Sequence, residues 1–258
     1  MKKIYKIVLI GAGNVATNIG KAIVAANHDI TQVWSKTSAS ANRLAKQLDA
    51  VPLTDIRKLH TDADIYILAV KDDTINSIVR KVKLNNKLIV HTSGSVDLDV
   101  LRQSSENYGV FYPLQTFSKT SNVKFDAIPL CVEANNKNSE KKLVELAGQL
   151  SKNVHVINSE KRKILHLAAV FANNYSNHMY AIAEKILKRN KLSLEMLIPL
   201  IDETSKKIKT TSPLKIQTGP AIRGDKKIMN KHLKMLSDDK LTKDLYRLIS
   251  KSIIANKK

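Results

Sequence analysis

The chain of 258 residues is 43% hydrophobic and 26% charged, which is typical of a soluble globular protein with one large domain or two modest ones. A single cysteine, Cys131, excludes an internal disulfide and leaves too few thiols for a zinc or iron–sulfur site, so we expect no metal and a reducing, cytoplasmic compartment. No stretch approaches the ~20 apolar residues that span a membrane. The net charge of +20 comes from lysines spread along the chain, and with 5% aromatic residues we expect no specific nucleic-acid partner.

Short apolar runs alternate with helical patterns through the first half of the chain. The strands that we expect span residues 4–10, 30–34, 64–70, 87–92, 129–134 and 154–157, with a further strand ending near residue 112. The helices that we expect span residues 13–26, 38–48, 74–82 and 139–150. This alternation predicts an α/β domain with a mainly parallel sheet wound by right-handed crossovers.

The first strand and the first helix are joined by the sequence Gly11-Ala12-Gly13-Asn14-Val15-Ala16. This is the G-x-G-x-x-G/A pattern of dinucleotide-binding folds, in which the glycines allow a tight turn and a close approach of the backbone to a pyrophosphate. The N-terminus of the following helix offers amide groups to the phosphates. We therefore expect residues 11–15 to bind a dinucleotide.

The end of the second strand indicates which dinucleotide is bound. NAD-specific folds usually carry an Asp or Glu about 20 residues beyond the glycines, where it binds the ribose 2′-hydroxyl. Residues 30–48 contain no carboxylate here, and offer instead the hydroxyl groups and cations of Ser35, Lys36, Thr37 and Arg43. Such groups suit a 2′-phosphate, so we expect NADP(H) rather than NAD(H).

Two later loops follow expected strands, at the sheet edge where ligands of such folds bind. The first contains Ala69 and Val70 and the second contains Thr92 and Ser93; we expect these four residues to flank the nicotinamide and its ribose. His91, at the end of the second of these strands, is a candidate general acid, and equally a candidate for a purely structural hydrogen-bonded residue.

The second half is helical, and its main feature is an expected long helix over residues 161–188. One face of this helix is an apolar stripe formed by Ala168, Ala172, Tyr175, Met179, Ile182 and Ile186. On a neighbouring face, His166, Asn173 and Asn177 fall within roughly 40° of one another at 100° per residue. Residues 165–183 contain no lysine or glutamate, so we interpret this polar face as a surface for substrate rather than for solvent.

Several of these segments together resemble one bacterial family, in which a Rossmann-like domain is joined to a helical domain of unknown function and whose members are labelled NADP oxidoreductases, some of them deazaflavin-dependent. The segments are Gly11–Ala16, His91–Ser95, Tyr112–Ser118, Phe171–Asn174 and Thr218–Asp225. More distantly, the chain is similar to pyrroline-5-carboxylate reductases, ketopantoate reductases and β-hydroxyacid dehydrogenases. The resemblance implies a helical domain of the 6-phosphogluconate dehydrogenase type that contributes groups to the substrate and forms a homodimer.

We therefore expect an NADP-binding Rossmann domain over residues 1–157 and a helical domain for substrate and dimerisation over residues 158–258. The expected function is hydride transfer between NADP(H) and a small carbonyl, imine or hydroxy-acid substrate, with His166 or His91 as proton donor. Asn173 would orient the substrate and Arg223, in the distinctive segment before the expected helix 226–236, would bind its anionic group. The alternative is a non-catalytic regulatory module that binds NADP(H).

Overall fold

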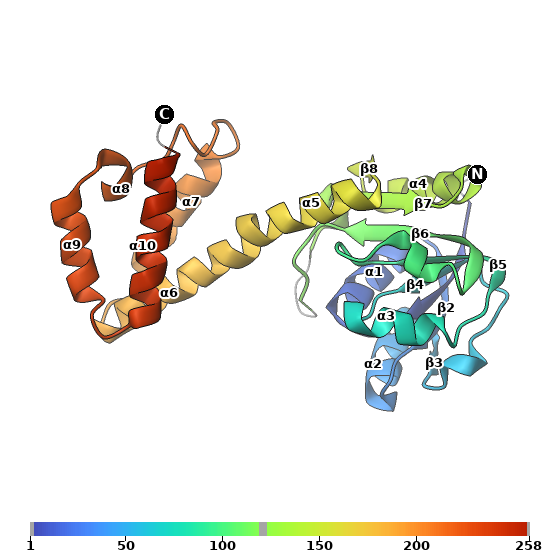
Figure 1. Cartoon of the computed structure of the whole chain (residues 1–258). Helices are drawn as coiled ribbons and strands as arrows, with labels where there is room; N and C mark the ends of the chain where they lie inside the picture. Colours follow the sequence, from blue (N-terminus) through green and yellow to red (C-terminus); the bar gives the residue numbers. More distant parts are fainter. Residues whose placement is uncertain (1–2, 119–122, 257–258) are drawn as a thin grey trace. The chain divides into compact units, whose positions relative to one another are not determined.

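The computed structural model describes residues 3–118 and 123–256, and these form two compact units, Met1–Val170 and Phe171–Lys258 (Figure 1). The units part after Val170, whereas the domain boundary that we expect from the sequence follows residue 157. The difference concerns the start of helix α5 (Ser159–Ala169), whose first turns are bonded to the sheet of the first unit. In the described residues, none of the helices has both the length and the apolar character required to cross a membrane.

The first unit is built on one eight-stranded sheet in the order β3-β2-β1-β4-β5-β6-β7-β8. Its strands are β1 (Lys6–Ile10), β2 (Asp29–Trp34), β3 (Val51–Leu53), β4 (Ile65–Leu68), β5 (Asn85–His91), β6 (Ser105–Pro113), β7 (Leu130–Ala134) and β8 (Val154–Val156). All neighbouring strands are parallel except β6 and β7, which are antiparallel. The predicted Rossmann fold is confirmed; β3 was not expected from the sequence, and its three residues are not a buried run.

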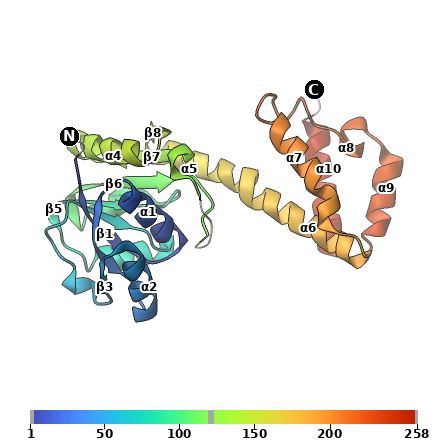
Figure 2. The same ribbon diagram turned by 180° about the vertical axis from the view of Figure 1, so that it is seen from behind.

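Helices cover both faces of this sheet because successive strand residues point to opposite sides. In β1, Leu9 packs in a core with α1 (Asn14–Ala25), α2 (Ser38–Leu48) and α4 (Lys137–Leu150). Its neighbour Val8 packs in a second core with α3 (Asp72–Val79). Figure 1 shows α3 in front of the sheet, and Figure 2, from behind, shows α1 in front.

Helices joined by turns form the second unit, and its described residues contain no strand. It contains α6 (Ser176–Arg189), α7 (Ile198–Lys207), α8 (Pro220–Arg223), α9 (Lys226–Met235) and α10 (Lys240–Ala255). Short 3-10 turns occur across both units at Ile56–Lys58, Leu98–Leu101, Phe125–Ala127 and Leu194–Leu197. The helical character that the sequence predicts for this half is therefore confirmed.

The prediction of one uniform α-helix over residues 161–188 is wrong in one respect. Between α5 and α6, Val170–Tyr175 forms a π-helical turn, in which hydrogen bonds reach one residue further along the chain than in an α-helix. The segment contains the consecutive Asn173 and Asn174, which have low helix propensity, and hydrophobic periodicity carries no signal for such a turn. The angular register that places His166, Asn173 and Asn177 on one α-helical face therefore does not hold across it.

Candidate functional site

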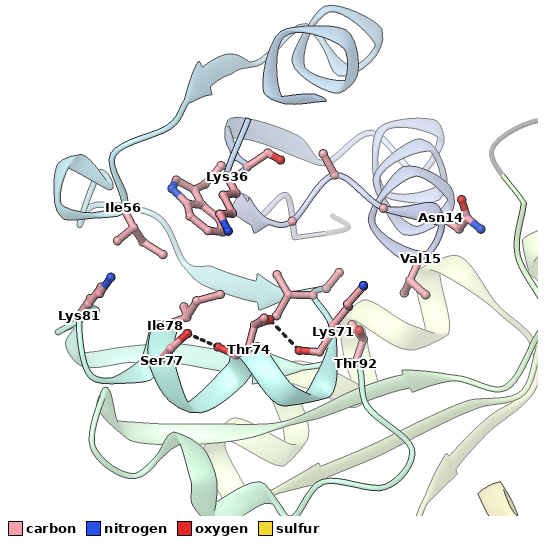
Figure 3. A pocket seen from close by; sticks show the side chains of 17 residues that line it. Asn14, Val15, Lys36, Ile56, Lys71, Thr74, Ser77, Ile78, Lys81 and Thr92 are labelled. Atoms are coloured by element: carbon pink, nitrogen blue, oxygen red, sulfur yellow. Dashed lines mark hydrogen bonds between the residues drawn. The ribbon is translucent and has the colours of Figure 1, made fainter. Parts of the chain in front are cut away.

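A cavity of about 730 Å³ opens at the carboxyl ends of the parallel strands of the first unit (Figure 3). It lies at the position where the strand order reverses, between β1 and β4, which is where ligands bind in open α/β sheets. Its walls are formed by Gly11–Val15, Trp34–Lys36, Ile56, Ala69–Lys71, Thr74, Ser77, Ile78, Lys81 and Thr92. The cavity has the volume of a typical site for a small molecule or cofactor.

The glycines of the first loop shape one wall of this cavity in two different ways. Gly11 has φ +128°, and a Cβ atom there would lie 2.2 Å from the carbonyl oxygen of Ala69, so only glycine fits between β1 and β4. Gly13 has an ordinary backbone conformation, and a Cβ atom there would meet no atom within 4 Å. Because Gly13 precedes the uncapped N-terminus of α1, the space beside it is suited to a phosphate held by the amide groups of the helix.

The charge of the cavity wall is entirely positive among its described residues. Lys36, Lys71 and Lys81 line it, and none of its lining residues is an aspartate or a glutamate. Ser35 and Lys36 stand at the end of β2, beside Trp34, whose indole N–H donates to the carbonyl oxygen of Thr54. A donor set of lysines, hydroxyl groups and free helix amides is suited to a ligand that carries several phosphates.

Of the residues expected to bind the cofactor, ten line the cavity: Gly11, Ala12, Gly13, Asn14, Val15, Ser35, Lys36, Ala69, Val70 and Thr92. Three do not: Thr37 is the exposed N-cap of α2, Arg43 is exposed further along that helix, and Ser93 is buried within the loop after β5. Sequence reasoning missed Lys71, Ser77 and Lys81, which face the cavity from α3 and its ends. The sequence signal for these residues was the helical spacing of Lys71, Thr74, Ser77, Ile78 and Lys81.

The two candidate roles of His91 can be compared from its contacts. Its side chain is fully buried; Nδ1 accepts a hydrogen bond from the backbone N–H of Ser93, and Nε2 lies 3.3 Å from the carbonyl oxygen of Asp97. Burial, and then the nearby Arg162, lower the pKa of His91 to about 4. The imidazole is therefore neutral at pH 7 and holds the loop after β5, which favours the structural role, and the catalytic role of His91 stays a prediction.

His166 lies against the same loop at Gly94, the second residue after Thr92 of the cavity wall. Its Nδ1 is 3.0 Å from the hydroxyl oxygen of Tyr112, at the end of β6, and the two rings meet edge to face. A Cβ atom on Gly94 would lie 2.6 Å from Nδ1 of His166 and 2.8 Å from the Tyr112 ring. Glycine at this position therefore allows the imidazole, the phenol and the loop to pack together.

The loop that Gly94 belongs to is tied to helix α3 by hydrogen bonds. The hydroxyl groups of Ser93 and Ser95 both donate to one carboxylate oxygen of Asp72, at 2.8 and 2.6 Å. The backbone N–H of Ser95 in turn donates to the Ser93 hydroxyl oxygen. These bonds fix the loop beside the cavity wall that α3 forms.

A buried ion pair fixes the start of the helix that carries His166. Arg162 is 1% exposed and bonds to the carboxylate of Glu133 on β7 and to the carbonyl oxygen of Val96. The same carboxylate accepts bonds from the backbone N–H and the hydroxyl of Ser159, at 2.8 and 2.9 Å. Because His166 is one helical turn beyond Arg162, this cluster determines where its imidazole stands.

Asn173 and Arg223 belong to the second unit. Asn173 lies in the π-helical turn and is exposed, and Arg223 is the exposed last residue of α8, followed by Gly224 in a left-handed conformation. Their predicted place in the same site as His166 stays a prediction. In the described residues, no group of histidine, cysteine or carboxylate side chains could hold a metal ion.

Comparisons with known proteins agree with this architecture. Residues 2–114 match the Rossmann-like domain family, and residues 128–253 match a domain of unknown function, DUF2520. The solved structure of a Bacteroides fragilis protein, assigned as an NADP oxidoreductase, is 43% identical, with 98% of each chain covered and a TM-score of 0.90.

Two more distant structures show the same fold. A protein of Thermotoga maritima is 22% identical, with 97% of each chain covered and a TM-score of 0.72. A 1-pyrroline-5-carboxylate reductase of Streptococcus pyogenes is 17% identical, with 98% of each chain covered and a TM-score of 0.64. No protein with a curated description matches the chain.

Proposed function

The chain belongs to the family that joins a Rossmann-like domain to DUF2520, the family of the Bacteroides fragilis protein, and from this premise we propose that it is an oxidoreductase that uses NADP(H). The observation that carries the proposal is the cavity of the first unit. It combines the glycine loop, an uncapped helix N-terminus and three lysines, with no carboxylate among its described lining residues. NADP(H) carries a pyrophosphate and a 2′-phosphate, and this donor set fits both.

We place the phosphates by the chemistry of the wall. The amide groups at the start of α1 hold the pyrophosphate beside Gly13, where an open space meets no side chain. Ser35 and Lys36 hold the 2′-phosphate at the end of β2. Val70 and Thr92, after β4 and β5, line the cavity, and we place the nicotinamide beside them.

The reaction that we propose is the reduction of a small carbonyl or imine compound, or the reverse oxidation. Bound NADPH would supply the hydride. On the protein side, the loop Thr92–Gly94 leads from the cavity wall to His166, which is partly exposed and is the candidate to contact the substrate. The roles predicted for Asn173 and Arg223, which belong to the second unit, stay predictions.

Cofactor choice gives the direct test. Titration of NADPH and NADH, followed by protein fluorescence from the single tryptophan, Trp34 in the cavity wall, should show tighter binding of NADPH. Lys36→Glu should weaken NADPH binding by about 1–3 kcal/mol, the scale of a lost charge-assisted contact, while NADH binding changes little. Equal affinities for the two cofactors in the wild-type chain would contradict the proposal.

A screen of small keto acids, aldehydes, imines and deazaflavin against NADPH oxidation would then identify the reaction. Tight NADPH binding without turnover of any of them would favour the non-catalytic regulatory module over the enzyme.

We also propose that the chain forms a homodimer through its second unit. In the described residues of this unit, large hydrophobic side chains are exposed at fifteen positions: Phe171, Tyr175, Tyr180, Ile186, Leu192, Met196, Ile198, Leu200, Ile208, Leu214, Met235, Leu241, Leu248, Ile249 and Ile254. Monomeric proteins rarely leave so much apolar surface in contact with water, so a second copy is the natural cover.

A further inference from the structure

The Nδ1 side of the His166 ring is fully occupied. The hydroxyl oxygen of Tyr112 lies 3.0 Å from Nδ1, and Gly94 packs so closely that a Cβ atom there would be 2.6 Å from Nδ1 and 2.7 Å from Cγ. Because Nε2 is on the other side of the ring from Cγ, it faces away from Gly94. In the described part of the chain, no residue forms a hydrogen bond with Nε2, and the side chain is partly exposed.

The surroundings of the phenol favour one direction for the Tyr112–His166 hydrogen bond. Tyr112 is 8% exposed, and burial raises its pKa to about 12, so that its hydroxyl keeps its proton at pH 7. Among the described residues, Nδ1 of His166 is the hydrogen-bond partner of this hydroxyl, so a buried O–H has an acceptor there if it donates. An imidazole whose Nδ1 accepts a hydrogen bond is neutral and carries its proton on Nε2.

Two nearby charged groups, Asp72 and Arg162, have hydrogen-bond partners other than His166. Asp72 is held by the hydroxyl groups of Ser93 and Ser95, and Arg162 is paired with Glu133. Neither ion offers a hydrogen bond to the imidazole of His166. A neutral phenol thus orients the ring from one side.

We propose that Tyr112 is a positioning residue that holds His166 as the Nε2–H tautomer, and that this N–H donates a hydrogen bond to the carbonyl oxygen of the substrate beside the nicotinamide. The inference rests on the proposed function and narrows it in two ways. A neutral imidazole acts by orienting and polarising the acceptor oxygen, as a hydrogen-bond donor, rather than as a cationic acid. The preferred substrate class is then a ketone or aldehyde, which has an acceptor atom, and not a protonated iminium ion, which has none.

The tautomer can be measured directly on the full chain, without knowledge of the substrate. Long-range ¹H–¹⁵N correlation spectra of histidine-labelled protein distinguish a protonated from an unprotonated ring nitrogen, and His166→Gln identifies the signals of His166 among the seven histidines. We expect protonated Nε2 and unprotonated Nδ1 in the wild-type chain. A protonated Nδ1 there would overturn the proposal with no need for a Tyr112 variant.

A matched pair of variants tests the role of the phenol. Tyr108 and Tyr112 are both on β6, are 7% and 8% exposed, and both use their hydroxyl in a 3.0 Å bond to a side chain, Asp99 and His166 respectively. Tyr112→Phe should lower the ratio of the two His166 tautomers roughly fivefold or more, the effect of one lost hydrogen bond. Tyr108→Phe should leave the ratio unchanged, and an equal effect of both variants would overturn the assignment.

Two ligands test the position of Nε2. NADP⁺ should shift the Nε2–H signal of His166, whereas 2′,5′-ADP, which carries the same 2′-phosphate and lacks the nicotinamide, should not. If NADP⁺ binds by fluorescence and the His166 signal does not move, the placement of the donor is overturned while cofactor binding stands. If neither ligand binds, the proposed function itself fails.

Discussion

The two units of the chain treat their apolar residues in opposite ways. The first unit buries long runs of them between its sheet and its helices, in cores on both faces. In the described part of the second unit, Ala221 and Ser250 are the residues that are buried, although the unit spans residues 171–258. Helices in globular proteins gain most of their stability from the packing of an apolar face, so a helical unit with so small a buried core depends on further contacts.

The apolar stripe predicted on the long helix shows the contrast within a few turns. Met179, Ile182 and Ile186 line a small apolar cavity with residues of α10, and are thus partly covered inside the second unit. Phe171 and Tyr175 pack edge to face, with their ring centroids 4.9 Å apart, and remain 62% and 50% exposed. Intramolecular packing therefore accounts for only part of the stripe.

Disruption of the proposed dimer is the largest effect that we expect, and it concerns the exposed apolar residues of the second unit. Leu241 and Leu248 lie two turns apart on α10 and are 81% and 66% exposed. If a second copy covers this row, Leu248→Glu removes about 1.5–3 kcal/mol of apolar burial and places an unpaired charge in the interface. We expect its dimer dissociation constant to rise at least ~100-fold.

Light scattering and sedimentation over a range of concentrations check this prediction. Leu248→Met keeps the position apolar and is the matched control, which should remain a dimer. A wild-type chain that is monomeric at every concentration would contradict the dimer. A Leu248→Glu variant that stays dimeric would place the interface elsewhere on the unit.

Inside the first unit, variants of the two loop glycines, Gly11 and Gly13, test stability and ligand binding separately. Gly11→Ala should lower the melting temperature, because φ +128° and the carbonyl oxygen of Ala69 both exclude a side chain, at a cost of about 1–3 kcal/mol or more. Gly13→Ala should melt like the wild type, since its Cβ atom meets nothing within 4 Å, and yet should weaken NADPH binding by about 1–3 kcal/mol.

Calorimetry and fluorescence titration of both variants measure the two effects separately. A Gly13→Ala variant that binds NADPH normally would mean that the open space beside the start of α1 is not the pyrophosphate site.

The buried His91 gives a smaller effect that belongs to the first unit alone. Its pKa of about 4 in the folded chain lies below the ~6.5 of an unfolded chain. Between these values the unfolded chain takes up a proton that the folded chain does not, so the stability that His91 contributes is present above pH 6.5 and falls as the pH is lowered toward 4.

His91→Gln keeps one acceptor and one donor without this titration. From pH 7.5 to pH 5.0, urea unfolding should show the wild type losing about 1–2 kcal/mol more than His91→Gln. Equal losses in the two proteins would contradict the burial of a neutral His91.

The elements of the fold differ in how far the sequence could predict them. Elements of the first unit were predictable because apolar runs and glycine spacing are local signals: the helix 38–48 agrees with the structure at both ends, and the loop 11–15 lines the cavity. The π-helical turn at Val170–Tyr175 was not, because no sequence pattern marks the residue at which it shifts the helical register, and the antiparallel pair β6–β7 was not, because the direction of a strand does not change its hydrophobic period.

The candidate site shows the same limit for side chains that are distant in sequence. Tyr112 and His166 meet across 54 residues, and the buried pair Glu133–Arg162 across 29, so no local pattern joins them. A buried arginine is also contrary to the usual exposure of charged residues, and composition alone would place Arg162 at the surface. Chemistry of this kind becomes visible only when the sheet brings its loops together.

The smallest effect that we expect concerns two cations and their contribution to NADPH binding. One was predicted from the sequence, and the other is identified by the fold. Arg43 was expected to bind the 2′-phosphate and lies outside the cavity lining, whereas Lys81, at the end of α3, lines it. Figure 3 shows Lys81 beside Ile56 and Ile78, at the end of the cavity away from Asn14 and Val15. An exposed lysine that pairs with a phosphate contributes modestly, so Lys81→Gln should weaken NADPH binding roughly two- to fivefold at low salt, and less at high salt. Arg43→Gln, which removes the same charge from a helix of the same unit, should bind NADPH like the wild type. Titrations of both variants at two salt concentrations distinguish the alternatives, because a weakened Arg43→Gln with an unchanged Lys81→Gln would move the phosphate away from α3 and toward the exposed face of α2.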